Sequence, residues 1–151
     1  MKKGPGLIRR ASLEDMEEVV NIENSSFDDP WSRELFLNDL YSDHADFLVY
    51  EKGGKVVGFI VCYVVMDEVE IANIAVSPIC RRENIGRQLL DKIISSHPGC
   101  TFYLEVLHTN SGAIAFYKNF GFEIVGLRKN YYGKDKDAIL MKLKIKGVNY
   151  A

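Results

Sequence analysis

Cysteine is scarce in this sequence, and its pattern is not that of a cross-linked or zinc-binding protein. The chain holds three cysteines, Cys62, Cys80 and Cys100, without a C-x-x-C pair, so we expect neither a disulfide framework nor a metal site. The net charge of −2 gives no reason to expect nucleic-acid binding through bulk electrostatics. The longest apolar run, residues 56–66, is too short for a membrane span and contains Gly58. These features predict a reducing compartment and no membrane partner.

A targeting segment and a metal centre also lack their usual signals. The N-terminal MKKGPG stretch is basic but has no apolar signal core behind it, so we expect a cytoplasmic location. The histidines, His44, His97 and His108, are scattered, and no pair has metal-ligand spacing. No serine or cysteine lies in a nucleophile motif. We therefore expect no metal cofactor and no covalent intermediate on a serine or cysteine.

The chain length and the apolar patterns predict a layered α+β protein. At 151 residues we expect a single domain, residues 1–151, with a core over about residues 7–145. Apolar runs predict strands at residues 7–11, 47–50, 56–65, 69–76, 101–107, 122–128 and 138–145. Helical spacing of apolar residues predicts helices between several of these strands. The fold class is a mixed, mostly antiparallel seven-stranded sheet with helices on both faces.

Two helices are expected before the second strand. Ser12 and Ser32 are typical N-cap residues, and the Asp-Asp-Pro-Trp sequence at residues 28–31 separates the two helices. The residues of the second helix expected to face inward are Leu35, Phe36 and Leu40. We expect the two helices and their Pro-Trp loop to form a flap more than a core element.

Residues 71–90 combine a buried strand, a basic turn and a helix. Ser77-Pro78 ends the strand because proline lacks a ladder donor, and the apolar spacing that follows predicts a helix. A helix N-terminus offers unpaired backbone N–H groups and the positive end of the helix dipole. With Arg81, Arg82 and Arg87 beside it, the turn is a candidate phosphate site. The alternative is an ordinary turn with solvated arginines.

The helix after this turn makes strands 69–76 and 101–107 parallel neighbours by a crossover connection. Open sheets bind ligands beyond the carboxyl ends of parallel strands, which is where the basic turn lies. Glu105 interrupts an apolar strand, and a carboxylate there is costly unless it is hydrogen-bonded or belongs to a site. Alternatively, Glu105 lies near the strand end and meets solvent. Glu70 is expected to be a solvated rim residue.

Several aromatic and polar residues have two interpretations. Tyr117 lies in an apolar helical stripe, where it is either a core aromatic or a chemical group. Asn110 is more typical of a helix cap than of a ligand contact. Trp31, Tyr131 and Tyr132 fall in expected loops, where exposed aromatics indicate a wall around a substrate; simple packing is the alternative.

The turn motif resembles that of the GNAT superfamily of acetyl-CoA-dependent N-acetyltransferases. The family pattern is Arg/Gln-x-x-Gly-x-Gly/Ala, and this chain reads Arg81-Arg82-Glu83-Asn84-Ile85-Gly86. Asn84 stands where the family usually has its first glycine, and asparagine is the non-glycine residue that best tolerates the left-handed conformation. The similarity spans about residues 7–145. It implies the GNAT fold, with acetyl-CoA as co-substrate and no metal.

Within the superfamily, the chain resembles the ribosomal-protein-alanine N-terminal acetyltransferases of the RimI type. The residues that carry this resemblance are Pro30-Trp31-Ser32, Asp67-Glu68, Asn73-Ile74-Ala75-Val76, Leu104-Glu105-Val106, Asn110, Ala115-Phe116-Tyr117, Gly121-Phe122, Arg128-Lys129-Asn130-Tyr131-Tyr132 and Asp137-Ala138. The resemblance implies that Glu105 is the general base and Tyr117 the general acid. It also implies binding of acetyl-CoA by Ile74, Ala75, Val76, Arg82, Glu83, Asn84, Ile85, Gly86, Arg87, Asn110 and Tyr117. The substrate-binding residues expected are Trp31, Asn73, Tyr131 and Tyr132.

The implied reaction is transfer of an acetyl group to the N-terminal α-amine of a protein or peptide, with a ribosomal protein among the implied partners. One alternative is an enzyme of the same fold that acetylates a small amine or a lysine side chain. Another is a non-catalytic acyl-CoA-binding module, against which the presence of Glu105 and Tyr117 counts. The sequence leaves open the target residue and the oligomeric state.

Overall fold

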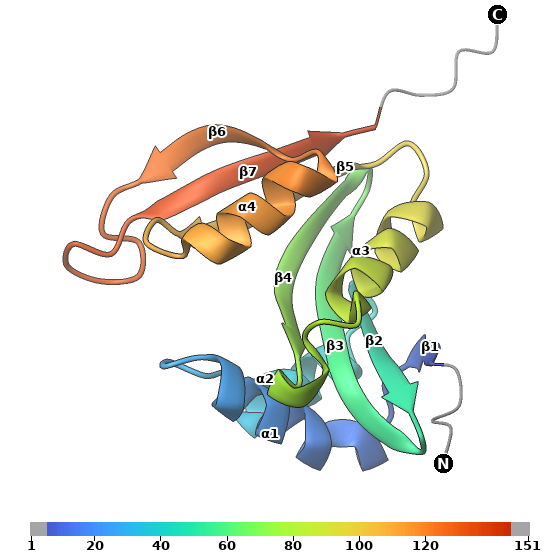
Figure 1. The fold of residues 1–151 in the computed structure, drawn as a ribbon. Helices are drawn as coiled ribbons and strands as arrows, with labels where there is room; N and C mark the ends of the chain where they lie inside the picture. The colour runs from blue at the N-terminus through green and yellow to red at the C-terminus, as the bar shows by residue number, and fades with distance from the viewer. Residues whose placement is uncertain (1–5, 146–151) are drawn as a thin grey trace, which may run out of the picture. The chain divides into compact units, whose positions relative to one another are not determined.

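The computed structural model describes residues 6–145 and confirms the expected fold class (Figure 1). The elements within these residues are β1 (Leu7–Arg10), η1 (Leu13–Asp15), α1 (Met16–Ser26), α2 (Arg33–Leu40), β2 (Ala45–Lys52), β3 (Lys55–Val65), β4 (Glu68–Val76), η2 (Pro78–Cys80), α3 (Ile85–Ser96), β5 (Thr101–Leu107), α4 (Ser111–Phe120), β6 (Glu123–Arg128) and β7 (Ala138–Lys144). The strands form one sheet in the order β1-β2-β3-β4-β5-β7-β6. The sheet is mixed, with β4 and β5 parallel and the pairs β1–β2, β2–β3, β5–β7 and β6–β7 antiparallel.

The chain divides into two compact units. The first unit comprises Met1–Val64 and Ala72–Ser96, and the second comprises Val65–Ile71 and His97–Ala151. The single domain expected over residues 1–151 stays a prediction, and most of the MKKGPG stretch lies outside the described residues. Among residues 6–145, no helix has the length and apolar character needed to cross a membrane.

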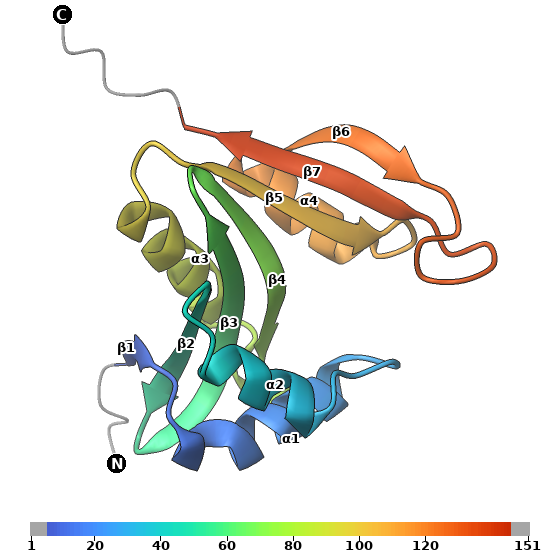
Figure 2. The same ribbon diagram turned by 180° about the vertical axis from the view of Figure 1, so that it is seen from behind.

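α1 and α2 belong to the core of the first unit, so the expectation of a flap is wrong. Phe36 on α2 is fully buried, and its ring meets Phe59 edge-on at 5.3 Å and Phe47 at 5.9 Å between ring centroids. The α1 residues of this cluster are Met16, Val19 and Ile22. Figure 2 shows both helices next to β2 and β3. Helices with a continuous apolar stripe need a sheet face to cover it, and these two cover the same face.

The helix caps lie at the residues that the sequence predicts, but one side chain does not point in the predicted direction. Ser32 Oγ accepts the Leu35 N–H at 3.3 Å, and Ser12 shares a capping box with Asp15. Phe36 is buried as expected, whereas the expectation for Leu35 is wrong because it is 48% exposed. Successive residues on a helix differ by about 100° in direction, so a short helix with a narrow buried stripe leaves one of two adjacent apolar residues outside.

The β2–β3 hairpin separates two helical layers within the first unit. Gly53 and Gly54 form its turn with φ of 59° and 76°, as the Gly-Gly pair predicts. A Cβ on Gly58 would lie 3.0 Å from Ile85 Cγ2, so α3 packs directly on the backbone of β3 there. Phe59, the next residue, faces α2. Because side chains alternate along a strand, α3 lies on the opposite face from α1 and α2.

The second unit is built on the parallel pairing of β4 with β5. Its register runs from Glu68 opposite Thr101 to Ile71 opposite Leu104, which confirms the crossover prediction. β7 pairs antiparallel with both β5 and β6. Gly121, with φ of 121°, ends α4 and donates its N–H to the Tyr117 carbonyl at 3.1 Å. The glycine is used here because the chain must leave the helix with positive φ.

Candidate active site

The connection from β4 to α3 has the strand, turn and helix that the sequence predicts. The Ser77 N–H donates to the Val57 carbonyl at 2.7 Å, and Pro78 then begins η2. Asn84 has φ of 59°, so it occupies the left-handed region in which asparagine was expected to replace glycine. The Asn84 carbonyl accepts the Gln88 N–H at 3.0 Å. α3 therefore begins directly after Asn84, and the positive end of its dipole lies at this turn.

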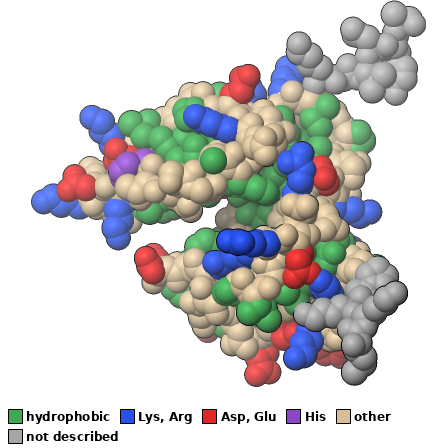
Figure 3. Space-filling view, viewed as in Figure 1, with side chains coloured by type: hydrophobic (Ala, Val, Ile, Leu, Met, Phe, Trp, Pro, Cys, Tyr) green, Lys and Arg blue, Asp and Glu red, His purple; other side chains and the backbone are tan. Residues whose placement is uncertain are grey.

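The arginines of this connection have different environments. Arg81 Nε donates to the Val76 carbonyl and Arg81 Nη2 to Ser26 Oγ, both at 3.2 Å, so Arg81 ties the end of β4 to the end of α1. Glu83 pairs with Lys52 of β2. Figure 3 shows Lys and Arg side chains gathered over the β4–α3 connection. Arg82 is exposed on this turn. A positive surface beside the positive end of a helix dipole suits a pyrophosphate.

The end of β4 lies beyond its pairing with β5. The register ends at Ile71, and Ile74, Ala75 and Val76 follow it. Ala75 is buried and packs in the cluster of α1 and α2. This stretch leads straight into the basic turn, so two groups of residues predicted to bind acetyl-CoA, those at the end of β4 and those of the turn, follow each other closely in the structure.

Two predicted substrate-binding residues meet at a carboxylate that the sequence did not single out as a site residue. Glu23 Oε2 accepts the Trp31 N–H at 2.9 Å, and Glu23 Oε1 accepts Asn73 Nδ2 at 2.8 Å. The Trp31 ring packs on Phe36 at 5.4 Å between centroids. Burial raises the pKa of Glu23, and the two hydrogen bonds oppose that rise. The signal was present, since Glu23 falls on the inward stripe of α1 one turn after Val19.

Glu105 lies in a polar cluster of the second unit. Its Oε1 is 3.3 Å from Arg128 Nη1, and the Arg128 guanidinium lies over the Tyr131 ring at 5.4 Å from its centroid. A hydrogen bond to Glu105, followed by the Glu105 charge, raises the pKa of Tyr131. The nearby carboxylate therefore favours the neutral form of the Tyr131 hydroxyl. The two predicted loop tyrosines stack edge-on, with Tyr132 at 5.1 Å from Tyr131.

A second carboxylate shares the sheet face of Glu105. Glu70 pairs with Tyr103 across the parallel ladder, so its side chain projects on the same face as Tyr103 and Glu105. Desolvation and then the like charge of Glu105 raise the pKa of Glu70, while Arg128 lowers it. Desolvation, then Glu105 and Tyr131, raise the pKa of Tyr132 to about 12. Glu70 is exposed as expected, but its electrostatic coupling to Glu105 was not predicted.

Tyr117 and Asn110 both have clear structural roles on α4. Tyr117 is buried, and its ring lies 5.2 Å from Phe116 and 5.6 Å from Phe122 between centroids. Asn110 Oδ1 accepts the Ala113 N–H at 3.2 Å and caps the helix, as one of the two interpretations predicted. The acid role of Tyr117 and the cofactor contact of Asn110 stay predictions.

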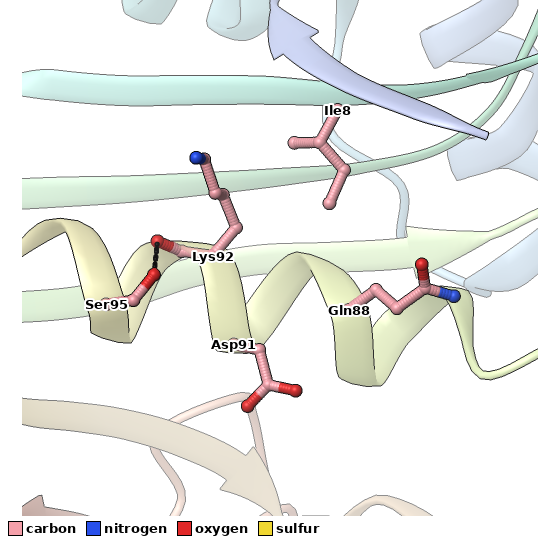
Figure 4. A pocket seen from close by; sticks show the side chains of 5 residues that line it. All are labelled: Ile8, Gln88, Asp91, Lys92 and Ser95. Atoms are coloured by element: carbon pink, nitrogen blue, oxygen red, sulfur yellow. Dashed lines mark hydrogen bonds between the residues drawn. The ribbon is translucent and has the colours of Figure 1, made fainter. Parts of the chain in front are cut away.

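A surface pocket in the first unit is lined by none of the predicted site residues. It is lined by Ile8 of β1 and one face of α3, namely Gln88, Asp91, Lys92 and Ser95 (Figure 4). Ser95 Oγ donates to the Lys92 carbonyl at 3.1 Å within the helix. No group of metal-binding side chains occurs among residues 6–145.

A seven-stranded mixed sheet of this order, in which β4 and β5 are the parallel pair, is the architecture of the GNAT acyltransferase fold. Residues 16–122 match the model of the acetyltransferase (GNAT) family. The ribosomal protein bS18-alanine N-acetyltransferase of Escherichia coli K12 is 35% identical over 144 residues, which cover 89% of this chain and 96% of that protein. The chain therefore belongs to the GNAT family and is an acyltransferase enzyme.

Solved structures agree with this assignment. The crystal structure of the ribosomal-protein-S18-alanine N-acetyltransferase from E. coli matches with a TM-score of 0.85 and 31% identity, covering 97% of this chain and 99% of that chain. The structure of Arabidopsis thaliana NAA60 in complex with acetyl-CoA matches with a TM-score of 0.83 and 20% identity, covering 95% and 100%. The second likeness concerns the fold alone.

Proposed function

We propose that this enzyme transfers an acetyl group from acetyl-CoA to the N-terminal α-amine of a protein, in the manner of the ribosomal-protein-alanine acetyltransferases. The observation that carries the proposal is the 35% identity, over 89% of the chain, to an E. coli enzyme named for that reaction. A ribosomal protein is the substrate class that this likeness favours.

The residues of the β4–α3 connection fit acetyl-CoA. Backbone N–H groups before Gln88, together with Arg82 and Arg87, are proposed to bind the pyrophosphate, and Asn84 supplies the left-handed turn that aims these groups. Ile74–Val76 are proposed to pair with the pantetheine arm as an added β-strand would. A strand N–H near Val76 then stabilises the tetrahedral oxyanion.

The reaction needs a neutral amine. A peptide α-amine has a pKa of about 7.7–8.0 and lysine about 10.4, so an N-terminus needs roughly 3.4 kcal/mol less work to lose its proton. Glu105 takes that proton through a water. The amine nitrogen attacks the thioester carbonyl, the carbon–sulfur bond breaks, and Tyr117 gives its proton to the departing thiolate. The attacking nitrogen loses its remaining extra proton to water, and that proton restores the Tyr117 hydroxyl. A thiol has a pKa of about 8.5 and a tyrosine about 10, so this transfer is accessible.

A peptide panel tests the proposal. Peptides that begin with Ala or Ser, each carrying one internal lysine, are incubated with acetyl-CoA and the acetylated position is read by fragment mass spectrometry. The matched controls are the same peptides with a blocked α-amine, and a polyamine. Acetylation of the α-amine supports the proposal. Products on the ε-amine or the polyamine indicate the small-amine or lysine alternative, and acetyl-CoA binding without any transfer indicates a non-catalytic module.

A further inference from the structure

Glu23 is an unusual place for a carboxylate. Its side chain is 1% exposed, and its partners are two N–H donors, the Trp31 backbone and the Asn73 amide. No cationic side chain within residues 6–145 pairs with it. It also lies in the last turn of α1, where the helix dipole disfavours a negative charge. Burial raises its pKa. An apolar or amide residue at this position would avoid the cost of a buried charge and the repulsion from the helix dipole, so stability alone does not account for a carboxylate here.

The carboxylate fixes two groups that come from distant parts of the first unit. A carboxylate only accepts hydrogen bonds, so the Asn73 amide must turn Nδ2 toward Glu23. Its carbonyl oxygen Oδ1 is thereby turned away from Glu23 and offers an acceptor. The second bond holds the backbone of the loop between α1 and α2 at Trp31, whose ring rests on Phe36. Glu23 therefore sets both the direction of one polar side chain and the position of one aromatic loop.

We propose that Glu23 is a positioning residue for the protein substrate: it orients the Asn73 carbonyl and the Trp31 loop to receive the first residues of the acceptor peptide. The inference rests on the proposed function, since it concerns the peptide end of that reaction. Acetyl-CoA recognition does not depend on it. The peptide amine that receives the acetyl group carries N–H donors, which can hydrogen-bond to the Asn73 oxygen. The Trp31 indole can pack against the side chain of a short first residue of the peptide.

The test distinguishes an effect on peptide binding from an effect on acetyl-CoA binding. Glu23→Gln keeps the shape but replaces one acceptor by a donor, so either one of the two hydrogen bonds is lost or the Asn73 amide turns over and points its oxygen inward. We expect the KM for the peptide to rise about tenfold, as for loss of one hydrogen bond to a charged group, with the KM for acetyl-CoA within about twofold. Glu18→Gln is the matched control, because Glu18 of the same helix accepts the Val56 N–H at 2.8 Å, away from Trp31 and Asn73. That variant should leave both KM values unchanged.

A compensating pair sharpens the test. In Glu23→Gln with Asn73→Asp, the new amide can accept from Trp31 and donate to the new carboxylate. Asn73→Asp alone sets two carboxylates against each other. We expect the double variant to have a lower peptide KM than either single variant. A double variant that is worse than both, or a Glu23→Gln enzyme whose two KM values rise together, would overturn the proposal in favour of a merely structural role.

Trp31 gives a readout that does not depend on turnover. It is the single tryptophan of the chain, so its fluorescence reports on this loop alone. We expect acrylamide to quench Trp31 more strongly in Glu23→Gln than in wild type or Glu18→Gln, and unchanged quenching contradicts the inference. If the wild-type enzyme acetylates no peptide α-amine, the proposed function fails and this inference fails with it. If the wild type is active but Glu23→Gln keeps its peptide KM, only the positioning role fails.

Discussion

The two units each contain a carboxylate paired with an arginine, and the two pairs differ in almost every respect. In the first unit, Arg9 binds Asp15 through two bonds of 2.7 and 2.9 Å, and the Asp15 side chain is 7% exposed. In the second unit, Arg128 approaches Glu105 at 3.3 Å, and the Glu105 side chain is 19% exposed. The first pair is bidentate and closed, whereas the second is a single longer contact beside a tyrosine.

From this difference we expect the first pair to stabilise the fold and the second pair to leave its carboxylate able to take part in the proposed reaction. Asp15 also accepts the Ser12 N–H at 2.7 Å, so it joins the end of β1 to the start of α1. The hydrogen bond from Arg9 lowers the pKa of Asp15. Glu105 instead lies near Arg128, Tyr131 and a second carboxylate, Glu70. A general base needs a carboxylate oxygen that a substrate or a water can reach, so we expect Glu105 rather than Asp15 to serve as one.

The largest expected effect follows from Glu105→Gln. We expect kcat to fall by about 10²–10⁴, the usual contribution of a general base. The loss should shrink as the pH rises past about 8, because the peptide α-amine then loses its proton unaided. Rates measured from pH 6 to 10 check this, with the melting temperature as a control for folding. A loss that is the same at every pH would make Glu105 an orienting residue.

The second prediction concerns Tyr117→Phe, which keeps the buried ring and removes only the hydroxyl. We expect kcat to fall about a hundredfold, the lower end for a proton-transfer group, because a thiolate is a moderately good leaving group. The KM for acetyl-CoA should change little, because the ring still packs on Phe116 and Phe122. Phe116→Leu on the same helix is the packing control. Full turnover in Tyr117→Phe would leave Tyr117 as a core aromatic only.

The third prediction compares how much the two arginines contribute to the free energy of unfolding. We expect Arg9→Met to reduce the free energy of unfolding by about 2 kcal/mol, because it leaves the buried Asp15 carboxylate without its charged partner. Arg128→Met should lose less than about 0.5 kcal/mol, since the Arg128 side chain is 55% exposed. Urea unfolding at pH 7 measures both. Equal losses would show that the two pairs are not different in kind.

The contribution of Asp15 to the free energy of unfolding depends on pH, and the direction of its pKa shift gives the sign of that dependence. Its folded pKa is lowered from the ordinary 3.8 by Arg9. The stability that the pair contributes is therefore present above about pH 3.8 and is lost as the pH falls through the folded pKa. The stability difference between wild type and Arg9→Met should narrow in that acid range and stay constant from pH 5 to 7. A difference that narrows instead above pH 5 would exclude Asp15 as the group responsible.

Local chemistry accounts for the parts of the fold that the sequence predicted. The caps at Ser32 and Asn110 and the parallel pairing of β4 with β5 each depend on neighbouring residues or on one connection. The left-handed Asn84 also followed from its residue type. Leu35 did not, because apolar spacing alone cannot tell which of two adjacent residues a short helix turns inward.

The candidate site depends on contacts that the spacing of residues along the chain does not reveal. The Glu23–Asn73 bond joins residues 50 positions apart, and Glu105 meets an arginine on another strand. Neither contact can be predicted from the spacing of residues along the chain, because each depends on where two separate elements meet. The sequence therefore named Trp31 and Asn73 as binding residues but not the carboxylate that holds both. It named Glu105 but not the coupling to Glu70.

The smallest expected effect comes from Asn84→Gly. Asn84 already has φ of 59°, so glycine relieves little backbone strain and adds freedom to the unfolded chain. We expect the Kd for acetyl-CoA, measured by calorimetry, to change less than about threefold. Met66→Gly is the matched control, because Met66 has φ of 55° in the β3–β4 turn, away from the predicted cofactor residues. Asn84→Val should weaken binding far more, since a β-branched residue resists this conformation. A gain above about tenfold in Asn84→Gly alone would mean that the Asn84 side chain, not its backbone, limits the approach of the pyrophosphate.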